Sequence, residues 1–321
     1  MDEFALINRY FKSAVDPSVV GVGDDSAILP VPEGMSLVVC KDLLIEGRHF
    51  FSDVDPRSLG HKSLAVNLSD LAAMGAKPHA CLLGLGLPRV DPAWVSEFAQ
   101  GLLALGSQWQ CPLVGGDTVL TSDAITISVT AIGLLPVSSR GLLRNAARPT
   151  DDIWISGSLG AADMALRLLQ QRLRDPKRQL SSLRGALEWP QPRVLLGQRL
   201  LGIANAAIDI SDGLLQDLSH ILQASGVGAI LQLDKLPVDP ALRTFDASVV
   251  REAVLQGGDV YELCFTVPQA DRAIVAGLGR ELGITLTCIG EVTEDRALRG
   301  VQADGSQTVL QPRGFNHFGK P

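Results

Sequence analysis

The chain has 321 residues, of which 46% are hydrophobic and 20% are charged, and its formal net charge is −7. This length and composition are typical of a soluble globular protein with two domains of ordinary size. The negative net charge argues against broad electrostatic attraction to nucleic acid or to an anionic membrane, so an anionic substrate would need locally placed cations.

Cysteine usage and the N-terminus predict a cytoplasmic protein. The five cysteines are dispersed and form no C-x-x-C pair, which argues against a disulfide framework and against a thiolate zinc site. The chain begins with the acidic Met1-Asp2-Glu3 where a secretory signal would be basic. No apolar run approaches the ~20 residues that span a bilayer, so we expect no membrane anchor.

The first half of the chain predicts alternating helices and strands. Apolar residues at helical spacing indicate helices at 2–14, 56–76 and 91–109, the last opened by an aspartate cap and a proline. Short apolar or alternating runs indicate strands at 36–40, 79–87, 113–114 and 124–135. Residues 115–117, Gly-Gly-Asp, are expected between the last two strands.

The second half repeats the α/β alternation after a polar, basic stretch at 136–149. We place the boundary there, which gives domains at 1–137 and 149–321. Strands are expected at 152–156, 207–210, 229–233, 261–267 and 284–289. Helices are expected after Gly160 and near 192–205, 213–224, 244–256 and 269–282. The basic stretch 172–184 is interpreted as a solvated helix or loop.

A scatter of aspartates carries most of the functional information. Each stands beside glycine, serine or a short apolar run, and the positions are Asp24, Asp25, Asp42, Asp70, Asp117, Asp209 and Asp212. Any one of them is best explained as a helix cap or turn residue. Several carboxylates at the ends of apolar segments, however, cost desolvation free energy unless cations or hydrogen bonds compensate them. Together they favour a shared site for hard cations such as Mg²⁺, which would hold a phosphate.

Other motifs are weaker. A Ser-Asp pair stands beside helical patterning in both halves, at Ser69-Asp70 and Ser211-Asp212, which suggests two related halves and could cap a helix near a phosphate. P-loop and protein-kinase loops are absent, and residues 156–160 (SGSLG) are only a weak candidate for an anion-binding loop. His49 could touch a substrate, although a lone histidine near a turn is more often structural.

Taken together, the motifs resemble those of bacterial thiamine-monophosphate kinases. These belong to the superfamily that also holds aminoimidazole ribonucleotide synthetase and selenophosphate synthetase. The resemblance covers nearly the whole chain, in order. It is carried by residues 21–27 (GVGDDSA), 46–50 (EGRHF), 65–75 (AVNLSDLAAMG), 115–118 (GGDT), 209–213 (DISDG), 261–263 (YEL) and 314–318 (GFNHF).

This resemblance implies ATP-dependent phosphorylation of thiamine monophosphate to thiamine diphosphate, by direct in-line attack on the γ-phosphate and without a phosphoenzyme. It implies a PurM-like α/β fold of two domains, with an N-terminal ATP- and Mg²⁺-binding domain whose sheet pairs with that of a second copy in a homodimer. Positions matching the family's Mg²⁺ ligands are Asp25, Asp42, Asp70, Asp117, Asp209 and Asp212. Positions matching ATP contacts are Gly116, Asp117, Arg144 and Ser211, and those matching substrate contacts are His49, Asp259 and Phe315.

Two departures from the family pattern leave alternatives open. Cys40-Lys41 stands where the family usually has Ser, Thr or Ala ahead of the strand-end aspartate, and Asp259-Val260 stands where it has Glu-Asp. A protonated lysine cannot ligate a metal, so Lys41 could supply a charge or hinder metal binding. The alternatives are another ATP-dependent enzyme of the superfamily, acting on a different substrate, and a non-catalytic nucleotide or thiamine-phosphate binding protein.

Overall fold

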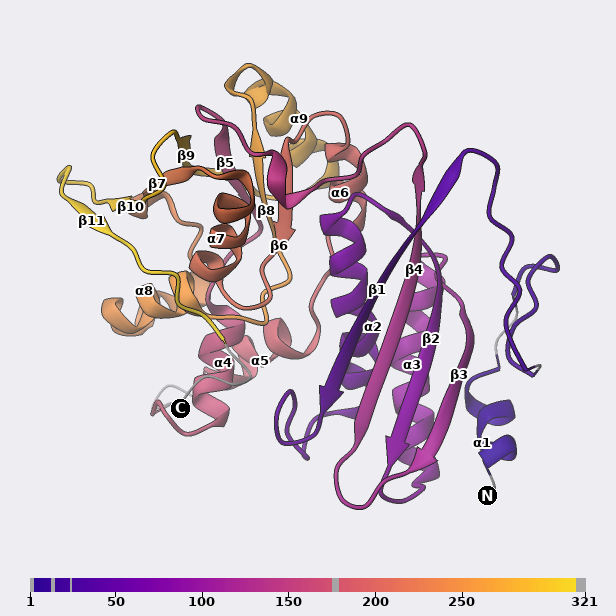
Figure 1. Ribbon diagram of the computed structural model, residues 1–321. Helices are drawn as coiled ribbons and strands as arrows, with labels where there is room; N and C mark the ends of the chain where they lie inside the picture. Colours follow the sequence, from indigo (N-terminus) through magenta and orange to yellow (C-terminus); the bar gives the residue numbers. More distant parts are fainter. Residues whose placement is uncertain (1–2, 13–14, 24, 175–178, 316–321) are drawn as a thin grey trace. The chain divides into compact units, whose positions relative to one another are not determined.

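The computed structural model describes residues 3–12, 15–23, 25–174 and 179–315 (Figure 1). The chain divides into two compact units. Unit 1 is formed by Met1–Leu71 and Ala76–Ser139, and unit 2 by Ala72–Gly75 and Arg140–Pro321. Each unit has its own sheet and its own helices. Among the described residues, no helix is both long and apolar enough to cross a membrane.

Unit 1 is a four-stranded sheet with two long helices on one face (Figure 1). Its strand order is β1-β4-β2-β3, in which β2 and β3 run parallel and the other neighbours run antiparallel. The elements are α1 (Glu3–Tyr10), β1 (Met35–Ile45), α2 (Pro56–Ala73), β2 (Lys77–Leu87), α3 (Pro92–Gln108), β3 (Leu113–Leu120) and β4 (Thr126–Pro136).

Close contact between α2 and α3 depends on two glycines. A Cβ atom at Gly60 would lie 1.9 Å from the carbonyl oxygen of Phe98, and one at Gly101 would lie 1.9 Å from that of Arg57. Helix α3 itself begins as predicted, because Asp91 accepts hydrogen bonds from two backbone N–H groups of the first turn. The two helices therefore pack backbone against backbone and leave little tolerance for added atoms.

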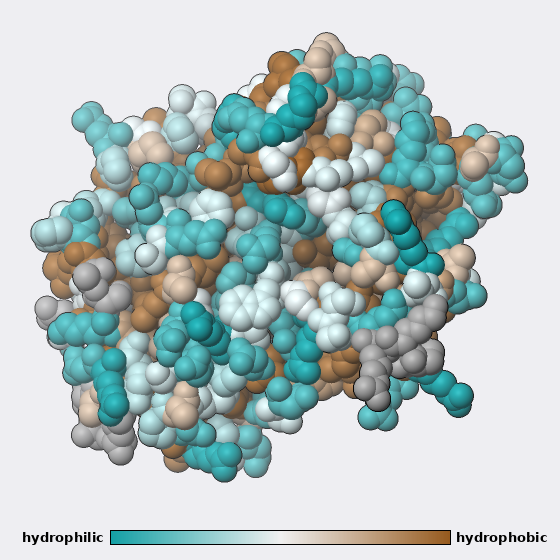
Figure 2. Space-filling view, turned by 180° about the vertical axis from the view of Figure 1, so that it is seen from behind, coloured by the Kyte–Doolittle hydropathy of each residue, from teal (hydrophilic) through white to brown (hydrophobic). Residues whose placement is uncertain are grey.

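The other face of this sheet is not covered by any described helix of unit 1. We call it the open face. It carries apolar side chains of β1, since Leu37, Val39 and Leu43 are 50%, 62% and 46% exposed. By contrast, the surface seen from behind is largely hydrophilic, with hydrophobic residues in scattered patches (Figure 2). An apolar sheet face of this kind is typical of a surface that another chain covers.

Unit 2 is built on a seven-stranded sheet of order β11-β10-β7-β9-β5-β8-β6. Its strands are β5 (Asp152–Ser156), β6 (Ala206–Asp209), β7 (Gly228–Gln232), β8 (Leu263–Val267), β9 (Leu286–Thr293), β10 (Leu298–Val301) and β11 (Gln307–Val309). Its α-helices are α4 (Ala161–Leu169), α5 (Leu180–Glu188), α6 (Val194–Leu200), α7 (Leu214–Ser225), α8 (Ala247–Gln256) and α9 (Arg272–Leu282). Short 3-10 helices are η1 (Arg144–Ala146), η2 (Leu233–Lys235), η3 (Pro240–Thr244) and η4 (Gln269–Asp271).

The mixed α/β architecture confirms the predicted fold class, but three local predictions were wrong. Asp117 lies inside β3, not between two strands. The Ser-Asp pairs are not equivalent, because Ser69-Asp70 lies within α2 whereas Ser211-Asp212 precedes α7. Strands β10 and β11 were missed because both are short and β11 is fully exposed, so neither shows an apolar run. Part of the basic stretch 172–184 belongs to helix α5.

Candidate active site

Strand β1 presents Asp42 and Lys41 on opposite faces of the sheet of unit 1. The Cys40 thiol lies 3.3 Å from the carbonyl oxygen of Asn67 in α2, so the side chain of Cys40 faces the helices. Asp42, two residues on, shares that face. Lys41 points to the open face, where its ammonium group donates to the Ser128 hydroxyl. The unusual lysine is therefore directed away from the face that carries the aspartate.

The order of the strands separates Asp42 from Asp117. Asp42 pairs with Val129 in β4, Val129 with Leu83 in β2, and Leu83 with Gly116 in β3. Three strand spacings of about 4.8 Å place the two edge strands roughly 14 Å apart. Because Mg²⁺ binds oxygen ligands at about 2.1 Å, these two carboxylates of one chain cannot share an ion.

The loop that carries Asp25 lies beside β3. It is closed by paired hydrogen bonds between Val20 and Ile28, at 3.0 and 3.1 Å, and Asp25 is exposed. A Cβ atom at Gly21 would lie 3.8 Å from the carbonyl oxygen of Val114, at the start of the strand that continues to Gly116 and Asp117. Asp25 and Asp117 thus stand on neighbouring segments. Asp24 of the same motif lies outside the described residues.

The backbone conformation at position 116 and the packing of β3 against β2 both require glycine. Its φ angle is +154° and an added Cβ atom would lie 1.9 Å from the carbonyl oxygen of Leu83. No other residue fits at this position without moving β2. Close packing of β3 against β2 therefore explains the glycine, and the ATP contact of Gly116 stays a prediction.

His49 is fixed within the turn that follows β1. The Ile45 N–H donates to His49 Nδ1 at 3.0 Å, and the His49 N–H donates to the Ile45 carbonyl at 2.9 Å. A ring nitrogen that accepts a hydrogen bond carries no proton, so the ring proton is assigned to Nε2. The structure thus gives His49 a structural role in the turn, and its substrate contact stays a prediction.

In unit 2, two loops far apart in sequence are hydrogen-bonded to each other. We call residues 209–213 and 257–262 the paired loops. Asp259 N–H donates to the Ser211 carbonyl, and Tyr261 N–H donates to the Ile210 carbonyl, both at 2.8 Å. The Ile210 N–H in turn donates to the Glu262 carbonyl at 2.8 Å. These bonds hold the two loops side by side. They therefore place four predicted site residues near one another: Asp209, Ser211, Asp212 and Asp259.

The second paired loop is conformationally strained. Asp259 and Tyr261 have φ angles of +60° and +56°, in the left-handed region that non-glycine residues rarely adopt. Such a conformation costs on the order of 1 kcal/mol per residue and is often found at functional sites. The Tyr261 hydroxyl lies 3.0 Å from Asp259 Oδ1 and holds that carboxylate. Val260 packs against the core of unit 2. The valine that departs from the family pattern here therefore makes an apolar contact.

The C-terminal segment returns to the first paired loop. The Phe315 N–H donates to the carbonyl oxygen of Asp212 at 3.0 Å, and Phe315 is 39% exposed. Phe315 therefore lies beside the loop aspartates, as the resemblance implies. Residues 316–318 of the same motif are outside the described part of the chain.

Asp217 belongs to this site although the sequence did not single it out. It is only 2% exposed, and its Oδ2 accepts hydrogen bonds from the backbone N–H groups of Asp212 and Gly213, both at 3.0 Å. Burial, together with the charges of Asp209 and Asp212, raises the pKa of Asp217 to about 7. The available signal was an acidic residue in the first helical turn, which can reach back to the preceding backbone.

A buried ion pair holds the end of the second paired loop, at Glu262. Glu262 is buried, and Arg193 Nε donates to its Oε2 at 2.6 Å while Arg193 Nη2 contacts Oε1. The Ser156 hydroxyl also contacts Glu262 and accepts a hydrogen bond from the Leu263 N–H at 2.9 Å. The hydroxyl of Ser156, a residue of the candidate anion-binding loop, therefore forms its hydrogen bonds inside the protein.

Comparison with known proteins identifies the family of this chain. The N-terminal domain of AIR synthase related protein matches residues 23–135, and its C-terminal domain matches residues 149–302. The thiamine-monophosphate kinase of Escherichia coli (strain K12) is 42% identical over 327 residues, covering 99% of each chain. The chain belongs to the thiamine-monophosphate kinase family.

Two solved structures of similar proteins extend the comparison. The thiamine-monophosphate kinase from Stenotrophomonas maltophilia K279a has a TM-score of 0.83 and 41% identity, covering 90% of this chain and 92% of that one. AaThiL complexed with AMPPCP and TMP has a TM-score of 0.77 and 30% identity, covering 92% of each chain. The family's fold is thus shared over nearly the whole length.

One position implied by the family resemblance, Arg144, lies apart from the paired loops. The Ser225 hydroxyl, at the C-terminal end of α7, donates to the Arg144 carbonyl at 2.9 Å. The paired loops meet the other end of this helix, and a 12-residue helix is about 18 Å long. Within unit 2 the backbone of Arg144 is therefore far from Asp212, and its ATP contact stays a prediction.

The six aspartates expected at the metal site are divided between the two units. Asp25, Asp42, Asp70 and Asp117 belong to unit 1, whereas Asp209 and Asp212 belong to unit 2. Within the ranges that the structure describes, no three His, Cys, Asp or Glu side chains are arranged to hold a metal ion. The metal-ligand roles of the six aspartates therefore stay a prediction.

Proposed function

We propose that this chain transfers the γ-phosphate of ATP to thiamine monophosphate and so forms thiamine diphosphate. The proposal is supported by its membership of the thiamine-monophosphate kinase family over its full length. A structurally similar protein was solved with AMPPCP, an ATP analogue, and TMP. The observation that carries the proposal is the convergence of Asp209, Asp212, Asp259 and Phe315 at the paired loops.

The proposed chemistry is a direct in-line transfer. A phosphate oxygen of thiamine monophosphate attacks the γ-phosphorus, the bond to the bridging oxygen breaks, and ADP leaves with that electron pair. Such a reaction depends on positioning and electrostatic stabilisation and needs no nucleophilic side chain. Gly116 and Ser211 would hold ATP, Asp259 would contact the substrate, and the exposed Phe315 ring would stack on its heterocycle.

The carboxylates present suit Mg²⁺ held together with a nucleotide. Mg²⁺ is usually bound through one or two carboxylates, with substrate phosphates and waters completing its shell. The carboxylates within each unit fit that pattern, and Asp42 and Asp117 of one chain are too far apart for one ion. In unit 2, burial and then the charges of Asp209 and Asp212 raise the pKa of Asp217, and cations would offset those two charges. When bound, Mg²⁺ would neutralise the charge of the transferring phosphate.

The open face supports a homodimer. Leu37, Val39 and Leu43 form an apolar stripe at the edge strand β1, and a second copy could cover it sheet against sheet. We place the dimerisation and Mg²⁺–ATP functions in the N-terminal domain, 1–137, and the paired loops in the C-terminal domain, 149–321. Val39→Asp should shift the sedimentation coefficient to that of a monomer, whereas Val309→Asp, at an exposed position in unit 2, should not.

We also propose a cytoplasmic location, supported by five cysteines that form no disulfide in the described part of the chain. The two departures do not favour the non-catalytic alternative. Lys41 points away from the face of Asp42, and Val260 packs against the core. Neither change introduces an unfavourable group beside the carboxylates.

The test is chromatographic detection of thiamine diphosphate made from thiamine monophosphate and ATP, with Mg²⁺ or with EDTA. We expect Mg²⁺-dependent product that is lost in Asp117→Asn, while Asp304→Asn, at an exposed turn, stays active. Full activity of Asp117→Asn would refute the metal assignment. ATP binding without turnover of thiamine monophosphate would favour a binding protein, and turnover of another acceptor would favour another enzyme of the superfamily.

A further inference from the structure

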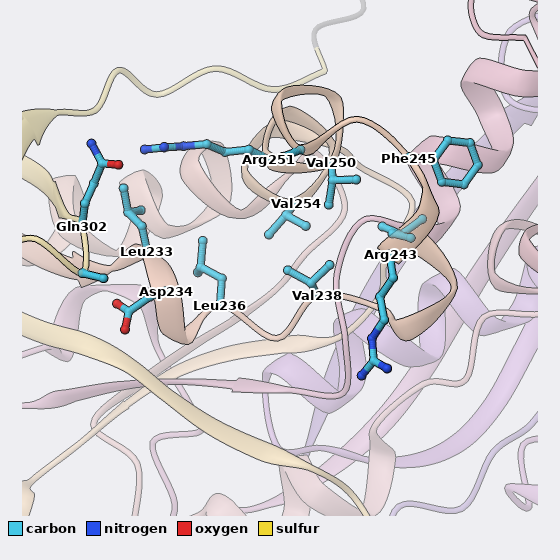
Figure 3. Close-up of a pocket in the computed structure, with 13 residues that line it drawn as sticks. Leu233, Asp234, Leu236, Val238, Arg243, Phe245, Val250, Arg251, Val254 and Gln302 are labelled. Carbon is cyan, nitrogen blue, oxygen red and sulfur yellow. The ribbon is translucent and has the colours of Figure 1, made fainter.

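Unit 2 contains a pocket whose lining residues have no role in the proposed reaction. It is a pocket of about 460 Å³ between α8, the segment 233–238 and the turn after β10 (Figure 3). Its walls are mainly apolar, and Leu236, Val250 and Val254 line its centre. This volume lies in the range of small-molecule sites.

The walls of this pocket are held in place by hydrogen bonds of their own. Leu159 N–H donates to the Pro237 carbonyl at 2.7 Å, and Asp239 N–H donates to the Leu159 carbonyl at 3.1 Å, which anchors one wall. Gln302 is held in a turn, where its N–H donates to the Ser306 carbonyl at 3.0 Å. Asp246 caps the start of α8. The pocket is therefore pre-formed, which lowers the entropic cost of binding.

Three polar side chains lie together at one end of the pocket. Figure 3 shows Arg251 stretched along the pocket toward the amide of Gln302, with Asp234 on the opposite side of that end. Arg243, by contrast, points away from the pocket. Among the described residues, neither Arg251 nor Asp234 takes part in an ion pair.

We infer that this pocket binds a small organic monoanion with an apolar body, such as an aryl-alkyl carboxylate. The apolar body would lie against Val238, Val250 and Val254, and the single negative charge would meet the Arg251 guanidinium and the Gln302 amide. Asp234 would oppose a second negative charge, which excludes nucleotides and diphosphates. The site is separate from the paired loops and does not depend on the function proposed for them.

The first test uses 4-phenylbutyrate as the probe, with binding followed by isothermal titration calorimetry on the full chain. We expect saturable binding at one site per chain, and weaker binding of the uncharged analogue 4-phenylbutanol. Absence of saturable binding, or equal affinity for the alcohol, would overturn the inference.

Variants then locate the site. Arg251→Gln should weaken binding roughly two- to five-fold, the range expected for an exposed ion pair, whereas Arg243→Gln should leave it unchanged. Val250→Trp should abolish binding by filling the pocket. Asp234→Asn should let phenylphosphonate, a dianion at high pH, bind more tightly than it does to the unaltered chain. Circular dichroism shows that each variant is folded, and equal effects of the two arginine variants would contradict the assignment.

Discussion

Replacing Asp217 by asparagine should make the protein more stable at high pH and leave it nearly unchanged at low pH. The asparagine oxygen can still accept hydrogen bonds from the Asp212 and Gly213 N–H groups, while the buried negative charge is removed. The folded protein raises the pKa of Asp217 from 3.8 to about 7. A group whose pKa is raised on folding contributes stability below its unfolded pKa, and that contribution is lost as pH rises through the folded value.

This pKa difference sets the size of the effect. A rise of about three in the pKa corresponds to a loss of at most roughly 4 kcal/mol in the free energy of unfolding. This loss develops between about pH 4 and pH 7. Urea unfolding in EDTA, at pH 5, 6, 7 and 8, measures the free energy of unfolding of both proteins. The advantage of Asp217→Asn should grow by a few kcal/mol across this range, while exposed Asp304→Asn shows no such trend. A constant difference at every pH, or a less stable variant at pH 8, would refute the reasoning.

Three further changes test other parts of the structure. Glu262→Gln leaves the partly buried Arg193 without its counter-ion and should lower the free energy of unfolding by about 3–5 kcal/mol, whereas Arg299→Gln, at an exposed pair, should cost less than about 1 kcal/mol in the same urea titration. Gly101→Ala should lower the melting temperature by several degrees or prevent folding, because its Cβ atom would lie 1.9 Å from a carbonyl oxygen of α2. Tyr261→Phe releases the neighbouring aspartate and should raise KM for thiamine monophosphate several-fold with KM for ATP unchanged; an equal change in both constants would contradict a substrate-positioning role.

Elements with strong local signals could be predicted from the sequence. Strand β5 is a run of five buried residues, and its predicted limits, 152–156, agree with the structure. Helix α3 carries both an aspartate cap and a proline at its start. Here the residues nearest in sequence determine the structure, so pattern alone is sufficient.

The site itself depends on contacts that no local pattern contains. The paired loops join residues about 50 positions apart, and the left-handed angles of Asp259 and Tyr261 follow from that pairing, since neither residue favours them. The separation of Asp42 from Asp117 follows from strand order, which the sequence does not reveal. Family resemblance supplied Asp259 and Phe315, whereas Asp217 became visible only through its burial.

The strand order of unit 2 also bears on how the chain folds during synthesis. Strand β5 is made first, yet its sheet neighbours are β8 and β9, which end at residues 267 and 293. The sheet of unit 1, in contrast, needs only residues up to 136. At a ribosomal rate of about 5–20 residues per second, β5 therefore waits roughly 7–28 seconds for its last partner. During that interval the nascent chain exposes an apolar strand with at least one unpaired edge, which is when we expect it to need a chaperone most.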